Sequence, residues 1–173
     1  MVELQRDPQT VTPDGEDTRP VPDGVRVRDI VTHTDDRGTL FELFDPRWGW
    51  HEAPIVSTYM FTVRPGVAKG WAVHREEEHR YAMIQGELLV VLYDERPDSP
   101  TRGLVSEIFL SEHRRRLMNI PRSVWHAVRN IGSKDALIIN FATAQFDHAN
   151  PDKYRLPLNN DRIPYRFEGV QGG

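Results

Sequence analysis

Residues 70–86 contain Gly70-Trp71-Ala72-Val73-His74, then His79 after four further residues, and then Gly86. Residues 121–130 contain Pro121-Arg122-Ser123-Val124-Trp125-His126 and, three residues later, Asn130. Successive side chains of a β-strand point to opposite faces, so Gly70, Ala72 and His74 share one face of their strand. Val124 and His126 share a face in the same way. If both faces line the inside of a barrel, the two histidines meet in its mouth.

Short apolar runs recur from Val25 onward and are separated by turn residues. They predict strands at residues 39–44, 55–63, 69–74, 81–84, 88–93, 105–110, 116–120, 125–129 and 136–142. The two runs on either side of Gly86 predict a β-hairpin. No long stretch has helical periodicity, and many short strands at near-even spacing predict an all-β sandwich or barrel.

The two ends of the chain differ from this pattern. Residues 1–24 are rich in Pro, Asp, Gly and Thr, which predicts a flexible arm or an arm ordered across a partner subunit. Residues 25–173 then form the single domain, a size that 173 residues in all suit well. The tail from Asn150 to Phe167 is irregular, carries three prolines and is expected to wrap the barrel.

Composition narrows the possible functions. A net charge of -4 argues against general binding of nucleic acid, which requires a basic excess. No apolar stretch is long enough for a membrane helix, and Met1 to Glu16 lack the apolar core of a signal peptide, so we expect a cytoplasmic protein that does not bind membranes. The absence of cysteine removes thiol nucleophiles and thiolate metal sites, so any metal must use His, Asp or Glu.

The spacing of the two opening stretches matches the two cupin motifs. Further similarity in order and spacing covers residues 25–167, and its most specific part is Asp94-Glu95-Arg96 followed by Asp98-Ser99-Pro100-Thr101. On these residues, and on Asp36-Arg37-Gly38 and Lys69-Gly70-Trp71, the chain resembles the dTDP-4-dehydrorhamnose 3,5-epimerase family of cupins. The resemblance implies a jelly-roll barrel (a double-stranded β-helix), a homodimer, a nucleotide-sugar ligand and no required metal. The related sugar 3,4-ketoisomerases are also similar.

Three positions depart from the epimerase pattern. Ala72 stands where the epimerases place their base histidine, and His79 stands where they keep a lysine. Their acid tyrosine is expected near Ile139 to Asn140 or near Phe146, and these residues carry no phenol. His74 lies two residues after Ala72 on the same strand face, so it could replace the missing base.

The first functional hypothesis is an isomerase or epimerase that acts on a nucleotide-linked 4-keto-6-deoxy sugar. His74 would be the base and His126 its partner, since imidazole titrates near neutral pH. The substrate-binding candidates are Arg37, Lys69 and Arg80 for a pyrophosphate, Trp71 for stacking on a sugar or base, and His79.

Two other functions stay open at this point. His74, His79 and His126 could hold a divalent metal, which would make the chain a metal-dependent cupin such as a dioxygenase or a decarboxylase. Ala72 and the missing tyrosine are also compatible with a non-catalytic cupin that binds sugars. The epimerase hypothesis itself requires no cofactor.

Overall fold

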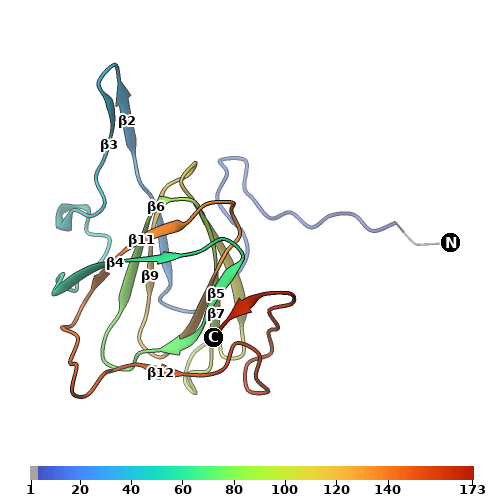
Figure 1. Ribbon diagram of the computed structural model, residues 1–173. Coiled ribbons are helices and arrows are strands. Elements are labelled where there is room, and N and C mark those ends of the chain that lie inside the picture. Colours follow the sequence, from blue (N-terminus) through green and yellow to red (C-terminus); the bar gives the residue numbers. More distant parts are fainter. Residues whose placement is uncertain (1–3) are drawn as a thin grey trace.

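A computed structural model describes residues 4–173 and shows two mainly antiparallel sheets packed face to face (Figure 1). The strands are β1 (Arg26–Asp29), β2 (Thr32–Asp35), β3 (Gly38–Phe41), β4 (Ser57–Val63), β5 (Val67–Val73), β6 (His79–Gln85), β7 (Glu87–Asp94), β8 (Val105–Ser111), β9 (Arg116–Ile120), β10 (Val124–Asn130), β11 (Ala136–Ala142), β12 (Tyr154–Arg155) and β13 (Gln171–Gly172), with one 3-10 turn, η1 (Pro46–Trp48). One sheet has the order β1-β9-β6-β11-β4, and the other has the order β12-β5-β10-β7-β8 with β13 added beside β5. The predicted all-β architecture is confirmed.

All nine predicted strands exist, but the predicted hairpin around Gly86 is wrong. Strand β6 pairs with β9 and β11, whereas β7 pairs with β8 and β10, so the chain changes sheets at Gly86. Gly86 adopts a φ of 83°, and a Cβ there would lie 3.0 Å from the Cα of Ala136. A glycine is therefore required because the backbone turns a corner against another strand.

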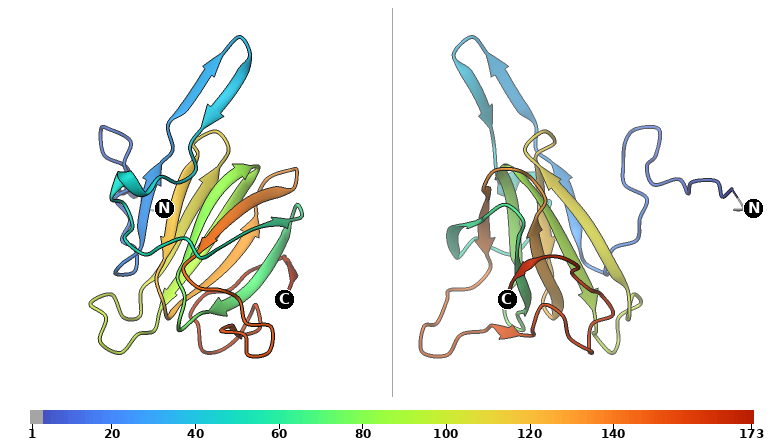
Figure 2. Two further views of the ribbon diagram at one scale, coloured as in Figure 1. Left: turned by 90° about the vertical axis from the view of Figure 1, so that its left-hand side faces the viewer. Right: turned by 45° about the vertical axis from the view of Figure 1, so that its right-hand side comes forward.

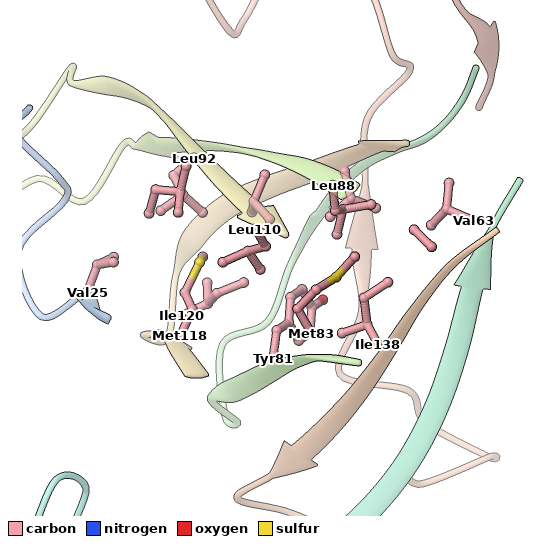
Figure 3. Close-up of a cluster of buried hydrophobic side chains, with 14 of the residues drawn as sticks. Val25, Val63, Tyr81, Met83, Leu88, Leu92, Leu110, Met118, Ile120 and Ile138 are labelled. Carbon is pink, nitrogen blue, oxygen red and sulfur yellow. The ribbon is translucent and has the colours of Figure 1, made fainter. Parts of the chain in front are cut away.

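The main core lies between the two sheets (Figure 3). Side chains that alternate inward along β6, β7, β8 and β9 fill it, including Met83, Leu88, Leu110 and Met118. Inward positions of β5, β6 and β10 also line a pocket, which shares Tyr81 and Val128 with this core.

Two further apolar layers cover the outer faces of the sheets. Trp71 and Trp125 point outward from the β12-β5-β10-β7-β8 sheet and are covered by Leu158, Ile163 and Phe167 of the C-terminal tail. The tail therefore wraps the barrel, as predicted. The outer face of the other sheet is covered by residues 41–50, which bring Phe44, Trp48 and Trp50 onto β6, β9 and β11.

The motif around Asp94 has a structural role. The buried carboxylate of Asp94 accepts hydrogen bonds from the side chains of Arg96, Ser99 and Thr101, so it holds the β7–β8 loop in one shape. Arg96 also donates to the carbonyl of Asp23, and the amide of Asp23 donates to Thr101. The motif thus fixes the end of the N-terminal arm where it joins the barrel.

Two segments project from the barrel. The hairpin of β2 and β3 rises from the end of β1, and the first described residues run away from the body of the molecule (Figures 1 and 2). Closer to the barrel, the arm contacts its own chain, because the carbonyl of Gly15 accepts from Arg114 and that of Pro20 accepts from Ser106. Within residues 4–173, no helix has the length and hydropathy to cross a membrane. An N-terminal arm ordered across a partner subunit, the homodimer and the cytoplasmic location stay predictions.

Candidate active site

Three histidines meet at the polar end of the barrel. His74 follows the last residue of β5, His79 begins β6 and His126 lies in β10. The ring centroids of His74 and His79 are 4.1 Å apart, and that of His126 lies 5.6 Å from His74 and 5.7 Å from His79. All three side chains are buried. The two stretches quoted at the outset therefore converge in one cavity.

The pairing of β5 with β10 explains how these residues reach the cavity. His126 lies opposite Ala72, and Val128 lies opposite Lys69, so between these pairs one residue of β10 faces two residues of β5. The extra residue is a β-bulge in β5, which breaks the strict alternation of side chains. As a result Lys69 and Ala72 both line the cavity, while Trp71 points to the outer face.

Glu77 contacts two of the histidines, and the sequence analysis did not single it out. Its Oε1 atom lies 2.9 Å from Nδ1 of His74 and 3.1 Å from Nε2 of His79. Burial acts to raise the pKa of Glu77, but the contacts with the two imidazoles outweigh it and lower the pKa to about 2. Burial lowers the pKa of His79 despite Glu77. These directions describe an ionised carboxylate that accepts a hydrogen bond from a neutral imidazole.

His74 makes the fewest hydrogen bonds of the three imidazole rings. Its Nδ1 approaches Glu77 without a well-directed hydrogen bond, and its Nε2 has no hydrogen-bond partner within residues 4–173. By contrast, Nδ1 of His126 lies 3.3 Å from the carbonyl of Val124. Burial, together with His79 and His74, lowers the pKa of His126 well below its usual value. An imidazole with a carboxylate beside one nitrogen and no partner on the other can accept a proton from a ligand at the second nitrogen.

Two phenols also line the cavity, although no tyrosine lies at the positions where the sequence comparison expects one. Tyr59 in β4 lies opposite Asn140 of β11, so a neighbouring strand supplies a phenol to that region. Tyr81 in β6 places its hydroxyl 3.4 Å from Nδ1 of His79. Burial raises the pKa of both phenols, so both are protonated at neutral pH. The cavity therefore holds two phenols, although Ile139, Asn140 and Phe146 carry none.

The cavity is small and has a basic wall. Its volume is about 140 Å³, and a second cavity of about 400 Å³ shares Tyr59, His74 and Lys153 with it. Three cations line the first cavity, namely Lys69, Lys153 and Arg155. None of them has a carboxylate oxygen within 4 Å in the described part of the chain. The cavity therefore favours an anionic ligand.

Two of these cations, Lys153 and Arg155, come from the C-terminal tail. The carboxylate of Asp152 accepts hydrogen bonds from the backbone amides of Arg75, Glu76 and Glu77, at 2.7–3.2 Å. Directly afterwards, β12 pairs with the free edge of β5, with Tyr154 opposite Val73 and Arg155 opposite Ala72.

Three predicted binding residues lie outside this cavity. Arg37 is at the tip of the β2–β3 hairpin, where it pairs with Asp35. Trp71 is fully buried under the tail and donates its indole N–H to the carbonyl of Leu158. Arg80 is fully buried on the outer face of β6 and donates to backbone carbonyls, because strand alternation turns it away from His79 and Tyr81. Lys69 and His79 do line the cavity.

The histidine cluster also has the composition of a metal site. One nitrogen from each of His74, His79 and His126 can be chosen so that all three lie within 4.8 Å of one another. Imidazole is a common ligand of Zn, Fe, Ni and Cu, and Glu77 offers a nearby carboxylate. The donor set therefore fits a divalent transition metal.

The buried neutral histidines lead to a prediction about stability. Since the pKa values of His79 and His126 are lowered from 6.5 by folding, the unfolded chain binds more protons below about pH 6.5 and folding is disfavoured there. Thermal unfolding between pH 7 and pH 5 should show a falling melting temperature, with a shallower slope for His126→Gln. The exposed His113 provides a control, because His113→Gln should keep the wild-type slope. An unchanged slope in His126→Gln would contradict this assignment.

Comparison with known proteins identifies the family of this chain. The family model described as the polysaccharide biosynthesis C-terminal domain matches residues 33–154. The chain belongs to this family. A probable low-salt glycan biosynthesis epimerase, Agl13, from Haloferax volcanii is 36% identical over 136 residues, which are 78% of this chain and 87% of the relative. The spore coat polysaccharide biosynthesis protein SpsL of Bacillus subtilis is 32% identical over 149 residues, which are 84% and 95% of the two chains.

Solved structures share the fold of this chain. A dTDP sugar isomerase from Desulfovibrio desulfuricans superimposes with a TM-score of 0.80 at 23% identity, covering 88% of this chain and 98% of the other. The predicted barrel of the dTDP-4-dehydrorhamnose 3,5-epimerase type is therefore confirmed as the fold. The resemblance to epimerase-like cupins that the sequence indicates is confirmed as well.

Proposed function

We propose that this protein is an epimerase or isomerase that acts on a nucleotide-linked 4-keto-6-deoxy sugar by histidine-mediated proton transfer. The observation that carries the proposal is the buried His74, which has Glu77 beside one ring nitrogen and no hydrogen-bond partner for the other within residues 4–173. The similarity to a glycan biosynthesis epimerase and to a dTDP sugar isomerase supports this class of reaction.

The side chains suit the removal of a proton next to a ketone. Nε2 of His74 takes the proton from the carbon beside the carbonyl, and the electron pair of the broken C–H bond forms an enolate whose negative charge lies on oxygen. Glu77, whose Oε1 lies 2.9 Å from Nδ1 of His74, is placed to orient the imidazole. Return of a proton to carbon, from Tyr59, Tyr81 or the imidazolium, completes the isomerisation, since both phenols line the cavity.

The charge of the cavity suits a nucleotide sugar. Lys69 and Arg155 lie on the wall and can contact a diphosphate, for which arginine is well suited. The first cavity, at about 140 Å³, is smaller than the roughly 300–1,000 Å³ usual for a small-molecule site, so a whole sugar nucleotide must extend beyond it. The adjoining cavity of about 400 Å³ gives the rest of the ligand room to extend.

Exchange with heavy water tests the reaction directly. Incubation of the protein with dTDP- or UDP-linked 4-keto-6-deoxyglucose in deuterium oxide should place deuterium at a carbon next to the ketone, as measured by mass spectrometry. A folded protein that causes no exchange in either compound would contradict the proposed reaction and favour a sugar-binding role without catalysis.

A metal-dependent cupin is the second candidate, because three imidazoles converge with a carboxylate beside them. A divalent metal held by His74, His79 and His126 would act as a Lewis acid on a bound oxygen. Elemental analysis of protein purified without a histidine tag separates the two candidates. About one metal ion per chain would support this second candidate, and a content far below that would contradict it.

A further inference from the structure

Lys153 occupies a position that no other cation of the site shares. It lines both the histidine cavity and the adjoining one, together with Tyr59 and His74, whereas Lys69 and Arg155 line only the first. The ammonium of Lys69 lies over the ring of Phe61, 5.0 Å from its centroid, which draws it to the wall. Lys153 is therefore the cation placed beside His74 at the junction of the two cavities.

The backbone fixes Lys153 in this place. Asp152 binds the three amides at the start of the β5–β6 loop, so the residue before Lys153 is tied to the segment that carries Glu77. Tyr154, the residue after it, pairs with Val73 and turns its ring outward under the guanidinium of Arg75. Because side chains alternate along a strand, Lys153 and Arg155 then both point inward. The position of Lys153 is therefore fixed by the backbone contacts of its two neighbours, Asp152 and Tyr154.

The electrostatic surroundings suit an anion at this point. Burial, Arg155 and Lys69 lower the pKa of Lys153, and Glu77 acts in the opposite direction. No carboxylate oxygen lies within 4 Å of its ammonium group among residues 4–173. The side chain of Lys153 is exposed by its accessible surface. A cation without a close counter-ion binds a developing negative charge more strongly than one that is already paired.

We infer that Lys153 is a further catalytic residue, which donates a hydrogen bond to the ketone oxygen of the sugar and stabilises the enolate formed when His74 removes the neighbouring proton. This inference rests on the proposed function. It assigns the electrophilic role to a residue of the C-terminal tail, and it leaves Lys69 and Arg155 to bind the diphosphate. The negative charge appears only after the proton is removed, so Lys153 contributes mainly to the rate and little to ground-state binding.

The test compares Lys153→Met with two other lysine variants. We expect Lys153→Met to lower kcat for deuterium exchange into 4-keto-6-deoxyglucose nucleotides by about 100-fold or more, as for the loss of one oxyanion donor elsewhere. The Kd for the nucleotide alone, dTDP or UDP, should change less than about threefold. Lys69→Met should instead raise KM and this Kd. Lys134→Met provides the matched control, because Lys134 pairs with Glu112 far from the cavity and its loss should leave kcat unchanged.

Each outcome bears on the inference. If wild-type protein exchanges deuterium and Lys153→Met keeps its kcat, or loses nucleotide affinity instead, the inference is overturned while the proposed function stands. If wild-type protein exchanges nothing, the proposed function fails and the inference fails with it. If Lys153→Met unfolds at the assay temperature, Lys153→Gln and Lys153→Arg replace it, and we expect Arg to recover part of the kcat that Gln loses.

Discussion

Replacing His74 with glutamine is expected to lower the rate of deuterium exchange by about 1,000-fold. A positioned general base typically contributes 10²–10⁴-fold, and Nε2 of His74 has no hydrogen-bond partner in the described residues. Glutamine fills the same space but cannot accept the proton. Binding of the nucleotide sugar, measured by calorimetry, should change only a few-fold. Deuterium exchange followed by mass spectrometry provides the rate.

The control for this variant is His113→Gln, which replaces an exposed imidazole outside the cavity and should keep the wild-type rate. An exchange rate for His74→Gln within about threefold of wild type would rule out His74 as the base. In that case His126 would be the next candidate, because it lines the same cavity. A loss of binding without a change of rate would point to a ligand-positioning role for His74.

Replacing Arg80 with methionine is expected to destabilise the fold by about 4 kcal/mol, because a net 1.5–3 kcal/mol is typical of a hydrogen bond to a charged group. The fully buried guanidinium donates to the carbonyls of Phe141, Ala53 and Pro54 at 2.8–2.9 Å. It also lies 5.0 Å from the ring centroid of Phe44. For a chain of this length we expect the melting temperature to fall by about 10 °C, as measured by calorimetry.

Arg37→Met is the contrasting variant. The guanidinium of Arg37 is 85% exposed and pairs only with Asp35 at the tip of the hairpin, so its loss should leave the melting temperature nearly unchanged. The sequence analysis placed both arginines in the same class, as candidates for pyrophosphate binding. An unchanged melting temperature for Arg80→Met, with weaker binding of dTDP or UDP, would restore that earlier interpretation and contradict the structural role.

The fold was predictable because two local signals agree along most of the barrel. Strands such as 116–120 and 136–142 have apolar residues bounded by turn residues, and their bounds match the structure. Strands β1, β2, β12 and β13 were missed because they are short, so only pairing with β9, β3 and β5 reveals them. The hairpin around Gly86 was predicted wrongly because a turn residue does not reveal which sheet the next strand joins.

The candidate site was predictable only in part. Alternation along two strands was enough to bring His74 and His126 together, and it also placed His79 beside Tyr81. The same rule, applied to Arg80, would have excluded it from the cavity. A residue count could not reveal the bulge that turns Lys69 inward.

The remaining site residues depend on tertiary contacts. Glu77 lies in a loop, where its direction is set by the amides that Asp152 holds. Lys153 lies in a tail without periodicity, and only the pairing of β12 with β5 brings it into the cavity. Tyr59 reaches the cavity from the strand beside Asn140, a position that motif-by-motif comparison does not examine.

A crystal structure of the His74→Gln variant with dTDP-4-keto-6-deoxyglucose tests most directly whether the histidine cavity is where the chemistry occurs. We expect the hexose ring in the cavity that residue 74 and His126 line, with a carbon next to the ketone within about 3.5 Å of the side chain at position 74. The ketone oxygen should point to the ammonium of Lys153. A hexose ring bound outside this cavity, or with its ketone turned away from both residues, would contradict the account.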